Sequence, residues 1–415
     1  MNSNFWKSLG PGLLFAGAAI GVSHLVQSTR AGAEYGLALL LFVPIACFFK
    51  YPAFAAGPYY AAATGKSLVA AYANQGRWAL VLFALLTVST MFTVEAAVTA
   101  MAAGLAVALT GLSIGMVSMS AVLLVLCAIV LRVGGFSWLD KLIKAMVAIL
   151  TVCTILATLL ALPELEWSQV SFLPQEYDLK VILFVAALVG WMPSAVDIAV
   201  WHSLWTLARK KQTGHRPEVK EALLDFNIGY LGTTILALCF VCLGASVMQT
   251  SGTEFAPQAH LFAAQVVDLY AASLGDWSRP MIGLAAFAIM FSTTLTVVDG
   301  FPRALSGVWY ALTEPDQPEQ SSETNRAYWV FVAVIGLGAL AIIGAFPASL
   351  KKLVDLATTI SFLTAPLLAG LNHRALFGRD IPASEQPSRW FRVHSLSGFC
   401  FLGGFALFYC SLFWK

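Results

Sequence analysis

Long apolar runs separated by short polar segments extend along this chain from end to end. A membrane-spanning helix needs about 20 consecutive, mostly apolar residues, and windows of that length predict about eleven spans. The spans centre near Phe15, Ile45, Met91, Leu124, Leu150, Met192, Leu236, Phe291, Val334, Ile360 and Leu407. The stretch from His260 to Leu274 is apolar but short and flanked by polar residues, which is typical of a helix at the membrane surface. The pattern predicts an all-α polytopic membrane protein.

Composition agrees with this prediction. Of the 415 residues, 59% are hydrophobic and 11% are charged, whereas soluble domains carry roughly 25% charged residues. The net charge of +2 offers no basic surface for a nucleic acid. The seven cysteines lie in apolar runs, which argues against a disulfide framework or a zinc site. We therefore expect the lipid bilayer and a small-molecule or ion substrate as partners, with no nucleic acid.

The distribution of Lys and Arg predicts the orientation. If the N-terminus is inside, most loop cations fall on the inner side, as at Lys66, Arg132 and Arg216, and few on the outer side, as at Lys180. The positive-inside rule then gives a cytoplasmic N-terminus and a C-terminus on the outer side. The chain carries no organelle address, so we expect a bacterial inner membrane. No hydrolase or zinc-protease motif is present, so we expect no enzyme and no cofactor.

Two spans contain helix breaks near the middle of the membrane. The first has Gly21 before polar residues, and the sixth has Gly190 and Pro193. A break frees backbone N–H and C=O groups, which lipid cannot satisfy, and paired breaks in two halves indicate a transporter site. Because these spans are five apart, we expect one transmembrane domain over 1–415. It would hold inverted repeats at about 8–162 and 180–373, and an extra helix at about 393–414.

Ionisable residues inside apolar runs are the next candidates for function. We expect three of these residues to have no oppositely charged partner nearby in the sequence, and we predict that they couple transport to an ion. They are Glu95, Asp197 and Asp299. Lys50 lies mid-span, and we expect it to face an acidic partner.

Other charges have simpler explanations. Arg30 and Glu34 stand four residues apart, so they are predicted to form a structural pair. Asp355 follows Lys351 and Lys352 near a predicted helix start, which favours a capping role at the interface.

With these motifs the sequence resembles the NRAMP metal transporters. The resemblance rests on Gly-Pro-Gly at 10–12, on Arg-Ala-Gly-Ala-Glu-Tyr-Gly at 30–36, on Met192-Pro193 and on the Ser/Thr-rich stretch at 292–296. It covers most of the chain. It implies a LeuT-type 5+5 inverted repeat with an extra helix, interrupted helices 1 and 6, and secondary-active transport by alternating access.

The resemblance fails at the metal-binding motif. The family's Asp-Pro-Gly-Asn is replaced here by Gly21, Val22, Ser23 and His24, while Met192 is retained and the family's His becomes Ser194. Glu95 falls where the family carries an acidic residue in the third span. Hard dications prefer carboxylate and carbonyl oxygens, so the loss of the Asp removes the expected anchor for a metal ion.

Two main hypotheses follow, with a third of smaller weight. In the first, the carrier binds a small organic solute in a nearly neutral pocket, coupled to H⁺ or Na⁺. The residues predicted to bind this substrate are Gly21, Ser23, His24, Trp191, Met192, Ser194 and Thr294. In the second, the carrier moves a divalent metal such as Mn²⁺ or Fe²⁺ through a rebuilt site of His24, Met192 and Asp197. The third is a membrane sensor that binds without transporting.

His24 has two interpretations. An imidazole titrates near roughly 6.5, so His24 could respond to pH during transport. It could equally be a neutral side chain that bridges two helices by hydrogen bonds.

Overall fold

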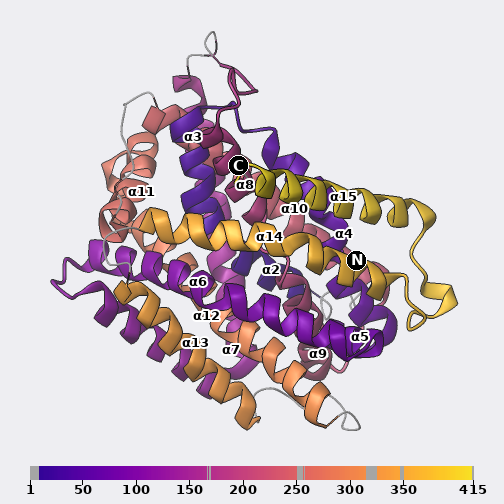
Figure 1. Cartoon of the computed structure of the whole chain (residues 1–415). Helices are drawn as coiled ribbons and strands as arrows, with labels where there is room; N and C mark the ends of the chain where they lie inside the picture. The colour runs from indigo at the N-terminus through magenta and orange to yellow at the C-terminus, as the bar shows by residue number, and fades with distance from the viewer. Residues whose placement is uncertain are drawn as a thin grey trace.

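The computed structural model describes residues 9–165, 167, 170–249, 256, 258–314, 325–345 and 350–413. Within these ranges the regular structure is helical (Figure 1). The first half of the chain forms α2 (Pro11–Ala19), a π-helical segment (Ser23–Ser28), α3 (Thr29–Tyr35), α4 (Phe42–Thr64), α5 (Leu68–Gln75), α6 (Arg77–Thr110) and α7 (Met116–Ala161).

The second half of the chain also consists mainly of long helices, with one interrupted span. It forms α8 (Leu179–Trp191), α9 (Ile198–Thr213), α10 (Val219–Leu243), the π-helical segment η4 (Gly244–Gln249), α11 (Ala259–Leu274), α12 (Arg279–Thr313), α13 (Arg326–Ala345), α14 (Leu350–Leu376) and α15 (Arg389–Ser411). Short 3₁₀ turns lie at Leu162–Glu164, Asp276–Ser278 and Ala383–Glu385. The short helix predicted at His260–Leu274 is confirmed as α11.

Among the described residues, eight helical stretches are long and apolar enough to cross a membrane. The number is nine if α2 and the helix over Ser23–Tyr35, bent by 46° at their junction, count as one span. α7 supplies two of the eight, Met116–Gly134 and Ile143–Glu164, and α8 is a shorter apolar helix. The all-α membrane architecture is confirmed, while the count of about eleven spans stays a prediction.

Local sequence signals set several helix ends. Asp178 begins α8 by accepting a hydrogen bond from the Val181 N–H at 2.8 Å, and Ser388 accepts one from Phe391 at the start of α15. These N-caps satisfy backbone donors that lack a partner inside the helix. At the other end, α6 stops at Gly111, whose φ of 66° is left-handed and suits glycine.

Small residues bring the helix backbones close together in the interior. A Cβ atom placed on Gly32 of α3 would lie 2.0 Å from the carbonyl oxygen of Val241. On the other side of this contact, a Cβ atom placed on Gly244 would lie 2.1 Å from the Thr29 carbonyl oxygen. Because lipid is as apolar as the helix surfaces, the hydrophobic effect drives helix association only weakly in the bilayer. Close backbone packing of this kind is therefore a main source of helix–helix attraction. α2 sits within this packing and contacts α7, α9, α10 and α12, near the centre of Figure 1.

Candidate functional site at the helix breaks

The break in the first span is held open by a side chain from α12. The hydroxyl of Thr293 donates to the carbonyl oxygens of Gly17 at 2.9 Å and Ile20 at 3.3 Å, so it satisfies groups that the break frees. A Cβ atom at Gly21 would lie 2.7 Å from Cγ2 of Thr293. Glycine at 21 therefore lets the break pack directly against α12. Gly21 acts here through backbone packing.

The break in the sixth span separates α8 from α9 and is held by Lys50 of α4. The Lys50 ammonium donates to the carbonyl oxygens of Val189 at 3.0 Å, Gly190 at 3.0 Å and Ser194 at 2.7 Å. Lys50 has no exposed surface. These carbonyls belong to the last turn of α8 and the segment after it, where intrahelical donors are missing. Gly190 also permits close approach of α14, since a Cβ atom there would lie 2.5 Å from the Thr358 carbonyl oxygen.

Asp197 lies directly before the first residue of α9, at its positive end. It is 1% exposed, and neither carboxylate oxygen has a hydrogen-bond partner among the described residues. Lys50 and Asp197 attract one another electrostatically without forming an ion pair within hydrogen-bond distance. The direct contacts of Lys50 are carbonyl groups, and no ion pair among the described residues confirms the expectation of an acidic partner.

A small cavity of about 30 Å³ lies between the two breaks. Its walls come from α2 and the residues after it, α6, the ends of α8 and α9, and α12. They are Ala18, Ala19, Val22, Ser23, Val94, Val98, Trp191, Ser194, Ala195, Ile198, Trp201, Thr293, Val297 and Phe301. Among the described residues, the lining has three hydroxyls and two indoles, and no charged side chain, imidazole or thioether. Of the residues predicted to bind substrate, Ser23, Trp191 and Ser194 line it.

His24 points away from this cavity toward α10. Its Nε2 lies 2.9 Å from the Thr233 carbonyl oxygen, and its Nδ1 lies 2.7 Å from the hydroxyl of Ser23. The hydroxyl of Ser23 also lies 2.5 Å from the carbonyl oxygen of Ala19. Since a carbonyl only accepts, Nε2 carries a proton, and the fully buried imidazole bridges the first span to α10. This geometry matches the bridging interpretation of His24.

Met192 and Thr294 are also directed elsewhere. The Met192 sulfur accepts from the Ser28 hydroxyl at 3.8 Å, and the Thr294 hydroxyl donates to the Met290 carbonyl within its own helix at 2.8 Å. In the part of the chain that the structure describes, no group of three or more His, Cys, Asp and Glu side chains could hold a metal ion. His24, Met192 and Asp197 each face a different neighbour.

Sequence reasoning missed Thr293, Trp201 and the two valines of α6 as cavity residues. A signal for Thr293 existed in the Ser/Thr-rich stretch, but the choice between Thr293 and Thr294 depends on the rotation of α12 about its axis. The valines, Val94 and Val98, lie four residues apart and so share one helix face beside the predicted Glu95.

Glu95 and Asp299 differ sharply in their surroundings. Glu95 accepts a hydrogen bond from Thr99 at 2.7 Å on one oxygen, while its other oxygen has no partner among the described residues. Asp299 is enclosed by donors: Arg303 at 2.9 and 2.7 Å, Trp205 at 3.0 Å and Tyr328 at 2.9 Å. The expectation that Asp299 has no nearby sequence partner was wrong, because Arg303 lies one helical turn later.

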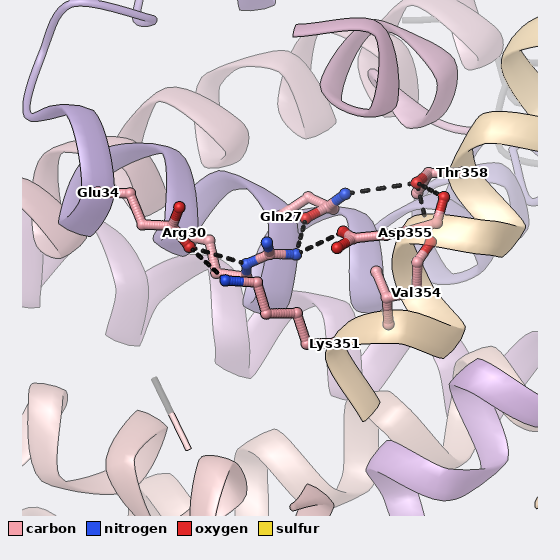
Figure 2. Close-up of polar contacts among 7 residues, drawn as sticks. All are labelled: Gln27, Arg30, Glu34, Lys351, Val354, Asp355 and Thr358. Carbon is pink, nitrogen blue, oxygen red and sulfur yellow. Dashed lines mark hydrogen bonds and ion pairs between the residues drawn. The ribbon is translucent and has the colours of Figure 1, made fainter. Parts of the chain in front are cut away.

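One end of the first span is closed by a polar cluster that joins α3 to α14 (Figure 2). Arg30 contacts Asp355 at 2.8 Å, Gln27 at 2.8 Å and Glu34 at 3.4 Å, and the Lys351 ammonium reaches Glu34 at 3.3 Å. We call these five residues the Arg30 cluster. The predicted Arg30–Glu34 pair is confirmed. Asp355 pairs with Arg30 across two helices, so its interpretation as a local cap was wrong.

The other end of the first span is held by Asp225 of α10. Its two carboxylate oxygens accept from the backbone N–H groups of Gly10 at 3.0 Å and Gly12 at 2.7 Å. These donors are at the start of α2, where the helix has no internal partners for them. Both ends of the broken first span are therefore tied to neighbouring helices, and the cavity lies between the two closures.

Comparison with known proteins decides the family. Residues 12–408 match the Nramp family, described as natural resistance-associated macrophage protein-like. The chain belongs to the Nramp family. An uncharacterised protein of Pasteurella multocida is 32% identical over 375 residues, which cover 88% of this chain and 84% of that protein. The Nramp membership makes this chain a membrane transporter.

Solved structures agree on the Nramp fold. The manganese transporter of Eremococcus coleocola superposes with a TM-score of 0.74 at 16% identity, covering 98% of this chain and 87% of that one. MhsT in complex with L-phenylalanine gives a TM-score of 0.63 at 16% identity, with 96% and 97% coverage. At such low identity these similarities establish the fold, with LeuT-type broken first and sixth spans. They do not identify the substrate.

Loosening the Arg30 cluster should open the Nramp cavity from that end. We expect Asp355→Asn to remove one of the two carboxylates that pair with the buried Arg30 guanidinium, the one from α14. A cysteine introduced as Ser194→Cys should then react severalfold faster with a membrane-impermeant thiol reagent. The protein without Ser194→Cys gives the background from Cys400 and Cys410, which are exposed. Lys351→Gln is the control, because Lys351 pairs with Glu34 at the exposed side of the cluster and, being itself a cation, does not pair with the buried Arg30, so the rate should stay unchanged. Equal rates in all three proteins would refute this role.

Proposed function

We propose that this Nramp-family protein is a secondary-active carrier of a small organic solute, bound between the two helix breaks and moved by alternating access. The observation that carries the proposal is the lining of the cavity. The hydroxyl oxygens of Ser23, Ser194 and Thr293 supply polar groups, those of Ser23 and Thr293 as acceptors because their protons are donated to backbone carbonyls. The indoles of Trp191 and Trp201 supply flat apolar surface. A mostly apolar pocket with a few convergent polar groups is typical of small-molecule sites.

The same lining disfavours a divalent ion as substrate. A dication must exchange its water shell for carboxylate or carbonyl oxygens, and the cavity has no carboxylate in its walls. The nearby Lys50 ammonium adds a positive charge at the second break, where it already occupies three carbonyl oxygens. We therefore favour a neutral or zwitterionic solute over Mn²⁺ or Fe²⁺.

The LeuT-type fold is used for both substrate classes. The Eremococcus coleocola protein is a manganese transporter, MhsT was crystallised with L-phenylalanine, and Mhp1, a nucleobase-cation symporter, with bromovinylhydantoin. The fold alone therefore does not choose between an ion and an organic solute. The side chains that line the cavity make the choice, and among the described residues they are uncharged.

The cavity is too small in this conformation to hold an organic solute. Since one water needs roughly 10–15 Å³ of such space, a cavity of about 30 Å³ holds about two waters. A solute must enter after one closure opens, either at the Arg30 cluster or at Asp225. We propose that the Arg30 cluster faces outside and Asp225 the cytoplasm, with the chain in a bacterial inner membrane and the two halves, 8–162 and 180–373, as inverted repeats.

Coupling to H⁺ or Na⁺ would drive the transport that we propose. Among the predicted coupling groups, Glu95 is the best placed for proton exchange, because it is buried and one of its oxygens has no partner in the described part of the chain. Its neighbours Val94 and Val98 line the cavity. Asp299 is enclosed by donors, and Asp197 faces the charge of Lys50.

Ligand-induced stabilisation tests the binding site. We expect at least one member of a panel of small neutral and zwitterionic solutes to raise the Tm of the purified protein, and Mn²⁺, Fe²⁺ and Co²⁺ to give no binding heat in calorimetric titration. Ala195→Phe, which fills the cavity, should abolish the Tm rise. The control is Ala341→Phe on the exposed face of α13, which should leave it intact. Saturable Mn²⁺ binding, with no response to any solute, would overturn the proposal.

A further inference from the structure

At the break in the sixth span, three backbone carbonyl oxygens surround one position, and a side chain of the protein itself occupies that position. The acceptors are the carbonyls of Val189, Gly190 and Ser194, each within 3.0 Å of the Lys50 nitrogen. No part of Lys50 is exposed. A cluster of carbonyl oxygens at the negative end of a helix is the kind of site that binds a small cation.

The three hydrogen bonds define the protonation state of Lys50 in this conformation. An ammonium group has three N–H donors, whereas a neutral amine has only two hydrogens. Donation to three carbonyl oxygens at once therefore requires the charged form. The ring of Phe54 lies 5.4 Å from the same nitrogen and adds a favourable cation–π contact.

A buried positive charge also needs compensation at longer range. Asp197, at the positive end of α9, is the acidic group that interacts electrostatically with Lys50. Neither of its oxygens has a hydrogen-bond partner among the described residues, so its charge is not neutralised by direct contacts. The Lys50 ammonium of α4 thus lies at the end of α8, and the Asp197 carboxyl lies at the start of α9.

We propose that the Lys50 ammonium is a built-in cation: it occupies the carbonyl site that the sixth-span break creates and takes the place of an inorganic monovalent ion there. Its occupancy fixes the backbone between α8 and α9. Trp191, Ser194 and Ala195 of that segment line the cavity, so Lys50 positions three of the cavity residues. The consequence for transport rests on the carrier function proposed above: this site should impose no requirement for Na⁺ or K⁺.

Chemical rescue tests the proposal without any transported solute. Lys50→Ala removes three methylene groups and the ammonium, which together correspond to n-propylammonium. We expect Lys50→Ala to lower the Tm by several degrees and n-propylammonium chloride to restore a large part of the loss, relative to choline chloride at equal ionic strength. Wild type should not respond. Lys50→Met fills the same space without donors, so it should have a low Tm that n-propylammonium does not change.

An equal Tm for Lys50→Ala in both salts would overturn the proposal. If Lys50→Ala does not fold, Lys50→Met carries the test in combination with Asp197→Asn. Removing the ammonium leaves Asp197 as an uncompensated buried charge, so Asp197→Asn should raise the Tm of Lys50→Met, although it lowers that of wild type. A fall of the same size in both backgrounds would show that the two charges are not coupled. Because these measurements need no substrate, they can fail or succeed independently of the proposed solute.

Discussion

Asp299→Asn should destabilise the folded protein by about 3–5 kcal/mol, because removing one partner leaves the other charge buried without compensation. Asp299 has no exposed surface and Arg303 is 7% exposed. The carboxylate receives two hydrogen bonds from the guanidinium, and one each from Trp205 and Tyr328. It therefore connects α9, α12 and α13 at a single point.

The measurement is the Tm of purified protein, with Asp276→Asn as the matched control. Asp276 also pairs with an arginine of α12, Arg279, at 2.9 Å, but its side chain is 87% exposed. Water and salt screen such a pair, so its loss should not change the Tm measurably. Similar small shifts in both variants would mean that the Asp299 carboxylate is not the anchor described here. Asp299 would then again be a candidate coupling group, which is the role predicted from its position in an apolar run.

Gly229→Ala should also be strongly destabilising, by about 1–3 kcal/mol, since overfilled packing forces helices apart. A Cβ atom at Gly229 of α10 would lie 2.0 Å from the Gly12 carbonyl oxygen, and one at Gly12 would lie 2.0 Å from the Asp225 carbonyl oxygen. α2 and α10 thus meet backbone to backbone, next to the hydrogen bonds from Asp225. Separating them should also weaken that closure.

The control lies on the same helix. Gly232 has no atom within 4 Å of the position its Cβ would take. Gly232→Ala should therefore be neutral or stabilising by up to roughly 1 kcal/mol, because alanine favours helix more than glycine does. The prediction compares the two Tm values directly. If Gly229→Ala is as stable as Gly232→Ala, the close crossing of α2 and α10 does not exist in the folded protein.

Much of the architecture could be predicted because the bilayer imposes strong rules on sequence. Apolar runs identify the helices, and glycine or proline beside polar residues in mid-membrane identifies both breaks. Gly21, Gly190 and Pro193 all lie at or next to the observed interruptions. The Arg30–Glu34 pair could also be predicted, since its four-residue spacing is a property of one helix.

The contacts across the breaks could not be predicted, because they depend on how different helices are rotated. Lys50 lies about 140 residues before the carbonyls that it binds. His24 and Met192 adjoin the breaks in sequence, yet the helical turns direct His24 to α10 and Met192 to Ser28. The partner of Asp299, by contrast, could have been predicted from the sequence, because Arg303 lies four residues later on the same helix.

Solute flux would show whether the uncharged cavity at the breaks carries a small organic solute. The purified protein would be reconstituted into liposomes, and uptake of Mn²⁺ and of a panel of small neutral and zwitterionic solutes would be measured against protein-free liposomes. We expect saturable uptake of at least one solute, lost in Ala195→Phe and kept in Ala341→Phe, with no Mn²⁺ uptake above background. Saturable Mn²⁺ uptake with no uptake of any solute would contradict this expectation.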